Sequence, residues 1–178
     1  MHVFLQGLRN IGKSTVILKT IDLLIARRSL LVGGFFTWNG GKGDLNVYIR
    51  PAASSPQEDI YRLASWNAEE SRLVCDIRVF EETGVRILKQ SKGADLIIMD
   101  ELGYLESNSP MFKQTVMDTI SGDIPILGVL RLGDIPWQND IKRNPKVTLY
   151  SVNEENRETL PQVILNATVH GVSEKLLF

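Results

Sequence analysis

Cysteine and histidine are scarce in this sequence of 178 residues. Cys75 is its only cysteine, so the chain cannot form an internal disulfide, and a reducing compartment such as the cytoplasm is expected. We interpret its thiol as buried and unreactive. The two histidines, His2 and His170, lie far apart and have no cysteines or carboxylates clustered around them. The sequence therefore does not indicate a metal site built from protein ligands alone.

Long apolar runs and an excess of charge of one sign are also missing. Lys and Arg number 20 and Asp and Glu number 21, so the net charge of −1 argues against an extended surface for nucleic acid or anionic lipid. No apolar run approaches the ~20 residues of a membrane span, and "MHVFLQG" does not resemble a signal peptide. No membrane or nucleic-acid partner is therefore expected. The length and the apolar content of 43% fit one globular domain with a core.

Strand and helix signals alternate along the chain. The runs "HVFLQ", "LLVGGFFTW", "ADLIIMDELG", "IPILGVL" and "KVTLYSV" predict strands, the last three as buried ones. Apolar spacing predicts helices over residues 13–28, with Arg27 and Arg28 in the last turn, over residues 77–90, with a weak point at Gly84, and over residues 109–121. This alternation predicts an α/β fold with a mostly parallel central sheet.

Two further segments have local signals of their own. The Gly-rich stretch "WNGGKGDLN" followed by "VYIR" predicts a β-hairpin insertion, and "DIYRLASW" predicts another strand. Asn153 is a plausible N-cap for a helix in "NEENRETLPQVIL". A capping box needs Glu or Gln three residues after the cap, but Asn156 stands there, so only the simple cap is expected.

The stretch "GLRNIGKST" contains the pattern G-x-x-x-x-G-K-[ST], between a predicted strand and a predicted helix. Glycines let the backbone wrap around phosphate groups, and the positive end of the following helix attracts an anion. Lys13 is expected to reach the β- and γ-phosphates, and the Ser14 hydroxyl is expected to bind Mg²⁺. The predicted phosphate-binding residues are Gly7, Leu8, Arg9, Asn10, Ile11, Gly12, Lys13, Ser14 and Thr15.

Two acids follow the apolar run "LIIM". Phosphate-loop proteins hold magnesium with an Asp at the end of a neighbouring buried strand, and Asp100 has that position. Glu101, one residue further, is predicted to orient a water for attack on the γ-phosphorus, the alternative being a helix-capping or surface acid. A catalytic Glu101 favours hydrolysis over phosphoryl transfer to another acceptor.

Several cations and aromatic residues are weaker candidates. Arg131 ends a predicted parallel strand and could meet the phosphates at the ligand-binding edge, as could Arg9 in the loop; an exposed arginine is the alternative for each. Asn156 and Arg157 follow the last predicted strand and could contact the base or ribose, or simply lie on a helix surface. The three tryptophans could stack on a base, but core or rim positions are more usual: Trp38, Trp66 and Trp137.

These pieces together resemble a known family. The stretches "GLRNIGKST", "VGGFFT", "VFEETGV", "ADLIIMDELGYLE", "MFKQTV", "PILGVLR" and "ENRETLP" have the order and approximate spacing of the THEP-type nucleoside-triphosphatases, the family of the cancer-related nucleoside-triphosphatase. The resemblance covers about residues 1–165. It implies a RecA-like P-loop NTPase fold, a three-layer sandwich, and Mg²⁺-dependent hydrolysis of ATP, GTP, CTP and UTP to the diphosphate and phosphate.

The resemblance also assigns roles to single residues. It implies that Asp100 holds magnesium, that Glu101 is the general base, and that Glu106 supports the site or the structure. Arg131 stands where the family often has a histidine, and "WNGGKGD" departs from the charged hairpin that family members usually carry. Residues 1–165 are thus predicted to form the P-loop NTPase domain, and residues 166–178 a C-terminal extension of unknown role.

Two other activities remain open from the sequence. One is a small-molecule or nucleotide kinase, which would need an acceptor pocket and an Arg-rich lid; no such lid is evident in the sequence. The other is a slow nucleotide switch that an unknown protein partner activates.

Overall fold

Eight strands form one sheet in the part of the chain that the computed structural model describes, namely residues 1–173, with side chains described for residues 1–167. The order across the sheet is β5-β4-β3-β2-β6-β7-β1-β8. The strands are β1 (His2–Gln6), β2 (Val32–Asn39), β3 (Val47–Pro51), β4 (Tyr61–Asn67), β5 (Arg72–Cys75), β6 (Leu96–Leu102), β7 (Ile126–Leu130) and β8 (Val147–Ser151).

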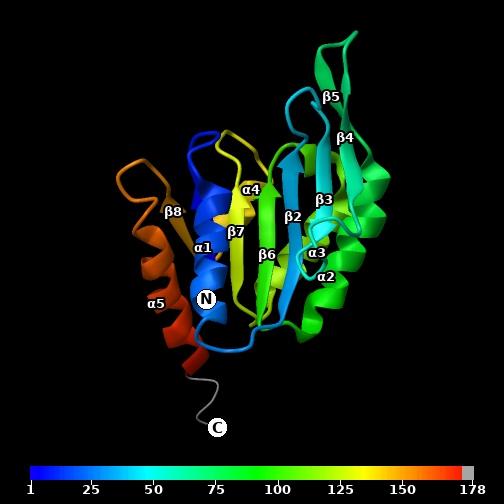
Figure 1. Cartoon of the computed structure of the whole chain (residues 1–178). Helices are drawn as coiled ribbons and strands as arrows, with labels where there is room; N and C mark the ends of the chain where they lie inside the picture. The colour runs from blue at the N-terminus through cyan, green and yellow to red at the C-terminus, as the bar shows by residue number, and fades with distance from the viewer. Residues whose placement is uncertain (174–178) are drawn as a thin grey trace.

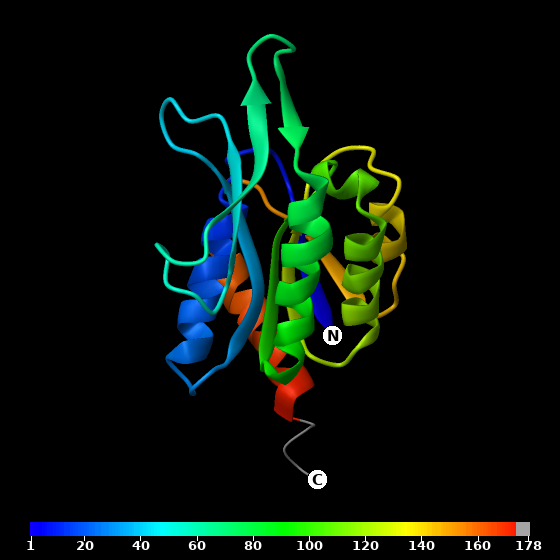
Figure 2. The same ribbon diagram turned by 90° about the vertical axis from the view of Figure 1, so that its right-hand side faces the viewer.

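Helices cover both faces of this sheet (Figures 1 and 2). One face carries α1 (Lys13–Ile25) and α5 (Leu160–Ser173); the other carries η1 (Val79–Gly84), α2 (Val85–Gln90), α3 (Pro110–Ser121) and α4 (Gln138–Lys142). Short 3-10 helices, η2 (Ser91–Gly93) and η3 (Leu105–Asn108), precede and follow β6. The predicted α/β three-layer sandwich is confirmed. None of the described helices has the length and apolar character needed to cross a bilayer.

The five strands β2, β6, β7, β1 and β8 are parallel, so their carboxyl ends meet at one edge of the sheet. In the register, Phe36 of β2 pairs with Asp100 of β6, and Leu5 of β1 pairs with Val129 of β7. The phosphate-loop stretch, Asp100 and Arg131 therefore all follow or end neighbouring strands at this edge. Ligands of open α/β sheets bind at such an edge.

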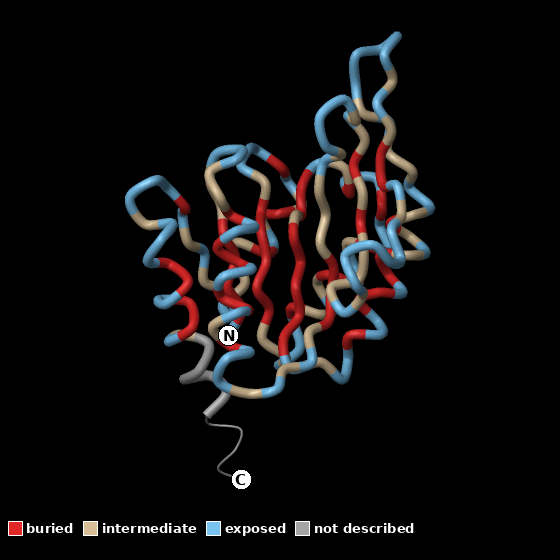
Figure 3. The backbone as a smooth tube through the Cα atoms, viewed as in Figure 1, coloured by how far each residue is buried: buried red, intermediate tan, exposed pale blue. Residues whose placement is uncertain are grey.

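Side-chain alternation along the strands divides the core into two clusters, one on each face of the sheet. The central strands that separate them are buried (Figure 3). On β1, Val3 and Leu5 belong to the cluster under α1 and α5, while Phe4 belongs to the cluster under α2 and α3. Strand β6 is buried on both faces, as its continuous apolar run predicts.

The other three strands, β3, β4 and β5, are antiparallel and extend the sheet beyond β2. Strands β2 and β3 form the predicted hairpin, and β4 is the strand predicted from "DIYRLASW". Strand β5 was not predicted, because its four residues give too short an alternation to stand out. The hairpin of β4 and β5 projects beyond the rest of the sheet (Figure 1).

Strand β8 is an edge strand rather than the buried strand expected from "KVTLYSV". It pairs only with β1, and its residues are half-buried or exposed. The expected turn of basic residues at the end of the first helix is also wrong: α1 ends at Ile25, and Arg27 and Arg28 lie in the following turn, where both amides bond the Leu24 carbonyl.

Gly84 does not interrupt the helix expected over residues 77–90. Its backbone is helical, at φ −60° and ψ −45°, where the π-helix η1 continues into α2. A Cβ atom there would lie 2.8 Å from two ring carbons of Phe112, which is fully buried. Gly84 thus makes room for an aromatic ring of α3 that also contacts Phe80 and Phe35.

The turn before α5 contains more than the simple cap expected at Asn153. Its Oδ1 accepts hydrogen bonds from the amides of Glu155 and Asn156, and Asn156 Oδ1 accepts one from the Asn153 amide at 2.9 Å. This is the reciprocal pattern of a capping box, with the amide oxygen of Asn156 in place of a carboxylate. Helix α5 itself begins later, at Leu160, and continues past residue 165 to Ser173.

Candidate functional site

The loop between β1 and α1 depends on residues that tolerate unusual backbone angles or lack a side chain. Gly12 has φ 106° and directly precedes α1, and Asn10 has φ 62°, both in the left-handed region. A Cβ on Gly7 would lie 2.6 Å from the Val152 carbonyl oxygen, which only glycine avoids. The loop therefore presents the first amides of α1, at Lys13, Ser14 and Thr15, which have no acceptor within their own helix. Such a helix start binds anions.

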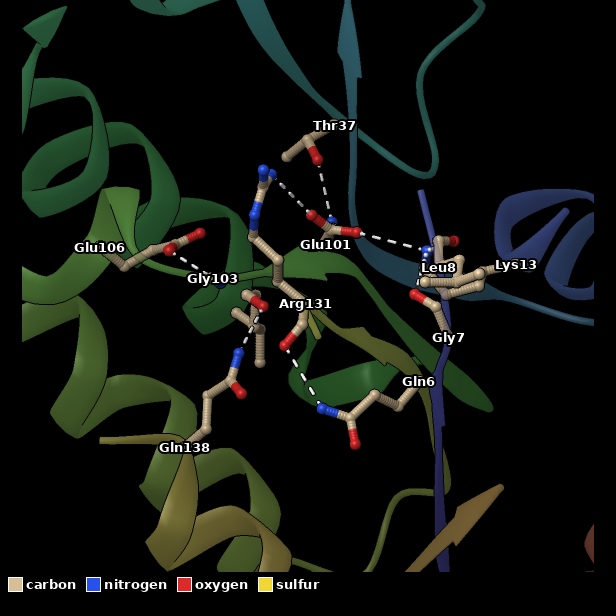
Figure 4. Close-up of polar contacts among 11 residues, drawn as sticks. Gln6, Gly7, Leu8, Lys13, Thr37, Glu101, Gly103, Glu106, Arg131 and Gln138 are labelled. Carbon is tan, nitrogen blue, oxygen red and sulfur yellow. Dashed lines mark hydrogen bonds and ion pairs between the residues drawn. The ribbon is translucent and has the colours of Figure 1, made fainter. Parts of the chain in front are cut away.

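Lys13 folds back onto this loop. Its Nζ donates to the carbonyl oxygens of Gly7 at 3.1 Å and Leu8 at 2.9 Å (Figure 4). The same nitrogen lies 4.0 Å from Glu101 Oε2. The ammonium group is thus placed between the loop and the end of β6, where a phosphate group seated on the loop would meet it.

Ser14 and Asp100 bring two oxygen ligands together. Asp100 is 2% exposed and shares a hydrogen bond with the Ser14 side chain. Burial raises the pKa of Asp100 to about 7, and Glu101 adds to this, whereas the Ser14 hydrogen bond and Lys13 oppose it. A buried carboxylate beside a hydroxyl fits Mg²⁺, which prefers oxygen ligands and would offset the cost of the buried charge.

Such a cation would need additional ligands. Within the described part of the chain, the side chains of His, Cys, Asp and Glu do not form a group of three or more that could hold a metal. Phosphate and water oxygens are the usual further ligands of magnesium in nucleotide sites. The pair of Ser14 and Asp100 therefore fits a magnesium ion that is shared with a bound polyphosphate.

Glu101 lies at the centre of the polar site (Figure 4). Its Oε1 is 3.4 Å from Arg131 Nη1, its Oε2 is 4.0 Å from Lys13 Nζ, and its side chain is 28% exposed. Its backbone amide donates to Thr37 Oγ1 at 2.9 Å, which ties it to the end of β2. A carboxylate held between two cations and open to solvent can orient a water and accept its proton.

Arg131 follows β7 and lies in the same cavity as the loop and Asp100. Its guanidinium group lies over the Tyr104 ring, 4.7 Å from the ring centre, and its backbone carbonyl accepts a bond from Gln6 Nε2 at 3.4 Å. Arg9, the other predicted arginine, also lines this cavity. The sheet edge thus brings Arg131 and Glu101 together, as the parallel strands predict.

The segment after β6 is held by side chains from two other elements. Glu106 is 2% exposed, and its Oε2 accepts a bond from the Gly103 amide at 2.9 Å. Burial raises the pKa of Glu106 to about 7. Trp137 Nε1 donates to the Gly103 carbonyl at 2.8 Å, and Gln138 Nε2 donates to the Leu102 carbonyl at 2.9 Å. The supporting role of Gln138 was missed, because nothing near it in sequence connects it to β6.

Some of the remaining candidate residues line the cavity, and the others lie outside it. Trp38 lines the cavity and stacks on Tyr48, whereas Trp66 is 40% exposed on the β4–β5 hairpin. The indole N–H of Trp137 is already bonded to the Gly103 carbonyl, so it supports the segment after β6. Asn156 uses both ends of its amide in the turn before α5, with Nδ2 donating to the Ser151 carbonyl. Arg157 lies beside the loop, its Cδ 3.8 Å from where a Cβ of Gly12 would be.

Predictions from the sequence also concern Cys75 and the two histidines. The Cys75 thiol is half-buried rather than buried, and burial raises its pKa to about 12, which keeps it unreactive. His2 is fully buried, and its ring lies beside backbone groups of Ile120 and Gly122. The side chain of His170 lies outside the described residues.

Comparison with known proteins places this chain in a family. Residues 2–165 match the sequence profile of the family described as NTPase. Nucleoside-triphosphatase THEP1 of Methanocaldococcus jannaschii is 31% identical over 175 residues, which cover 97% of this chain and 99% of that protein. The cancer-related nucleoside-triphosphatase homolog of Bos taurus is 28% identical, over 92% of this chain and 94% of the other.

Solved structures agree on the fold. The crystal structure of THEP1 from Aquifex aeolicus superposes with a TM-score of 0.78 at 21% identity, covering 94% of this chain and 99% of that one. The solution structure of a human cancer-related nucleoside triphosphatase has a TM-score of 0.74 at 25% identity, covering 93% and 96%. The predicted resemblance is thereby confirmed, and the chain belongs to the NTPase family, with the P-loop α/β fold and a candidate nucleotide site at the carboxyl edge of its sheet.

Proposed function

We propose that this member of the NTPase family is a Mg²⁺-dependent enzyme that hydrolyses nucleoside triphosphates to the diphosphate and phosphate, with little selection among bases. The observation that carries the proposal is the position of Glu101. Its carboxylate lies between Lys13 and Arg131. In sequence, Glu101 directly follows Asp100, which accepts a hydrogen bond from the Ser14 side chain. A water on the Glu101 carboxylate would face a γ-phosphate bound to the loop.

The chain's own groups account for the steps of hydrolysis. The loop amides and Lys13 bind the β- and γ-phosphates, and Lys13 exchanges its bonds to Gly7 and Leu8 for phosphate oxygens. Glu101 accepts the water proton as the water oxygen attacks phosphorus, and the bond to the bridging oxygen breaks. Arg131 stabilises negative charge on the phosphoryl group. Magnesium, held by Ser14 and Asp100, would neutralise phosphate charge when bound.

Broad base tolerance is supported by the turn of residues 153–159. None of these residues lines the cavity, and the Asn156 amide is occupied at both ends by hydrogen bonds within the turn. To select one base, the site needs a side chain that is free to hydrogen-bond the polar edge of that base. A wrong base is rejected because it leaves this side chain without its hydrogen-bond partner. Arg157 remains next to the loop and can contact ribose or phosphate of any nucleotide.

The test measures phosphate release with Mg²⁺ and each of ATP, GTP, CTP and UTP, in parallel with nucleotide binding. Glu101→Gln is expected to bind nucleotide within a few-fold of wild type and to lose about 10²–10⁴ in kcat, the usual contribution of a general base. Glu154→Gln, at an exposed acid in the turn before α5, is the matched control and should behave as wild type. Binding without phosphate release in wild type would refute the hydrolase proposal. A strong preference for one base would refute base tolerance alone.

Location and domain limits are also proposals. The single cysteine supports a cytoplasmic protein. Residues 1–165 serve as the nucleotide-binding domain, and the C-terminal extension of residues 166–178 starts inside α5.

A further inference from the structure

Strand β6 departs from regular sheet pairing at the point where it carries its two acids. Its register with β7 shifts between Met99 and Leu102: three steps along β6, from 99 to 102, match two along β7, from 128 to 130. Among the described strands, Asp100 and Glu101 therefore have no partner in the register with β7. One extra residue of this kind is a β-bulge, and bulges beside active sites re-aim a side chain.

The shift removes the acceptor that the Glu101 amide would have on β7. The amide of Ile97 donates to the Pro125 carbonyl, which directly precedes β7, at 2.9 Å. Alternate residues of a strand direct their amides to the same neighbouring strand, so the amides of Ile97, Met99 and Glu101 would all face β7 in a regular parallel ladder. With that pairing interrupted, the Glu101 amide needs another acceptor, because a part-buried N–H without one costs free energy.

The hydroxyl of Thr37 provides this acceptor from the opposite neighbour, β2. Its Oγ1 accepts the hydrogen bond from the Glu101 amide at 2.9 Å (Figure 4). The placement follows from the β2 register, in which Phe36 pairs with Asp100 and Thr37 is the next residue. Thr37 also pairs with Ile49 of β3, which holds it in the sheet independently of β6. The hydroxyl therefore replaces a ladder bond that the bulge has broken.

The contacts of the Glu101 carboxylate differ in kind from this backbone bond. Its oxygens lie 3.4 Å from Arg131 Nη1 and 4.0 Å from Lys13 Nζ. A bound triphosphate would engage both cations, because it carries more negative charge than one carboxylate. The Thr37 bond faces no such competition, since it involves neither of these cations. It is therefore a contact that can still locate Glu101 once nucleotide is bound.

We propose that Thr37 is a positioning residue for hydrolysis. Its hydroxyl holds the backbone of Glu101, so that the carboxylate keeps its place beside the γ-phosphate after Lys13 and Arg131 have turned to the nucleotide. This inference rests on the proposed function, in which Glu101 accepts the water proton. Thr37 acts on that step only through Glu101. Because a displacement of about 1 Å can lower a rate about 100-fold, loss of this bond should appear in kcat.

The first test compares three variants. Thr37→Val removes the hydroxyl but keeps the β-branched shape of the side chain. It should lower kcat for phosphate release about 10- to 100-fold and leave the affinity for a non-hydrolysable ATP analogue within about threefold of wild type. Thr37→Ser keeps the hydroxyl and should retain kcat within about threefold of wild type. Thr148→Val, the same change at a half-buried residue of β8 outside the cavity, is the matched control and should behave as wild type.

The outcomes of this comparison are decisive for the hydroxyl. Thermal unfolding verifies that each variant is folded. Wild-type kcat in Thr37→Val would overturn the proposal, and so would an equal loss in Thr37→Ser and Thr37→Val, because the methyl group rather than the hydroxyl would then carry the effect.

A double variant tests whether Thr37 acts through Glu101. If the Thr37 hydroxyl serves only to locate the carboxylate, it has no carboxylate to locate in Glu101→Gln. Adding Thr37→Val to Glu101→Gln should then leave kcat within about threefold of Glu101→Gln alone. If the two losses multiply, Thr37 acts by another route and the proposal is wrong.

A measurement without turnover separates failure of this inference from failure of the hydrolase proposal. Hydrogen exchange of the Glu101 amide, followed by NMR without nucleotide, should be about tenfold or more faster in Thr37→Val than in wild type and Thr37→Ser, since the amide loses its acceptor. If wild type releases no phosphate, the hydrolase proposal fails, and the exchange rate still decides whether Thr37 holds Glu101. An unchanged exchange rate in Thr37→Val refutes the role of Thr37 while leaving hydrolysis untouched.

Discussion

Replacing Asp100 by Asn should stabilise the folded protein while abolishing its magnesium-dependent activity. Burial raises the pKa of Asp100 from 3.8 to about 7, so the folded state binds a proton more tightly than the unfolded chain. The Asp100 carboxyl therefore lowers the free energy of unfolding as pH rises from about 4 to about 7. Above pH 7 the group is ionised in both states, so this loss stays constant. At about 1.4 kcal/mol per pKa unit, the full cost is about 4 kcal/mol. Asn cannot ionise, and its Oδ1 can still accept the Ser14 hydrogen bond.

Urea unfolding without magnesium or nucleotide measures this difference at several pH values. Asp100→Asn should exceed wild type by up to about 4 kcal/mol near pH 8.5 and by about 2 kcal/mol near pH 5.5, with Tm rising by roughly 10 °C at the higher pH. The control is Asp134→Asn, the same change at an exposed residue, which should stay within about 0.5 kcal/mol of wild type. If Asp100→Asn stabilises the protein equally at every pH, the ionised Asp100 carboxylate is not what destabilises wild type, and the argument is refuted.

Three other predictions concern single residues. Arg131→Gln should lower kcat for nucleotide hydrolysis by about 10²–10³ with little change in nucleotide binding, whereas exposed Arg143→Gln should not; steady-state kinetics decide this. Gly84→Ala should cost about 1–3 kcal/mol in urea unfolding, because its Cβ would lie 2.8 Å from the Phe112 ring, whereas Gly93→Ala has open space and should be neutral. Burial, with the nearby N-terminal amine and Lys146, lowers the pKa of His2 to about 4, so wild type should lose up to about 3 kcal/mol as pH falls from 6.5 through 4. His2→Phe should not lose this stability between pH 6.5 and 4. If His2→Phe has the same dependence of stability on pH as wild type, the prediction is contradicted.

The position of the candidate site at the carboxyl edge of the sheet was predictable because its signals are local. The glycines, Lys13 and Ser14 lie within eight residues of one another, and Asp100 directly follows an apolar run. A strand that is buried on both faces needs such a run, so β6 and its acids could be placed at the carboxyl edge. The parallel arrangement then put Arg131 at the same edge without any knowledge of contacts.

The supports of the site were not predictable for the opposite reason. Gln138 bonds a carbonyl 36 positions away, and Thr37 bonds the amide of Glu101 from 64 positions away. Contacts of this kind depend on how elements pack, and a polar residue at the start of a short helix or within a strand gives no sign of them. Leu63 and Leu73, on adjacent antiparallel strands, likewise come to line one cavity only through the pairing of those strands.

The folded-back position of Lys13 sets a condition on the ligands that this site can bind. Its ammonium already has two carbonyl acceptors, at Gly7 and Leu8, so removing a ligand leaves no buried charge without a partner. To bind Lys13, an inorganic phosphate must displace the hydrogen bonds to Gly7 and Leu8, and it makes few other contacts that offset their loss. A triphosphate offers a row of oxygens that also engages the loop amides and Ser14. We therefore expect this lysine to favour binding of a triphosphate over retention of the phosphate product.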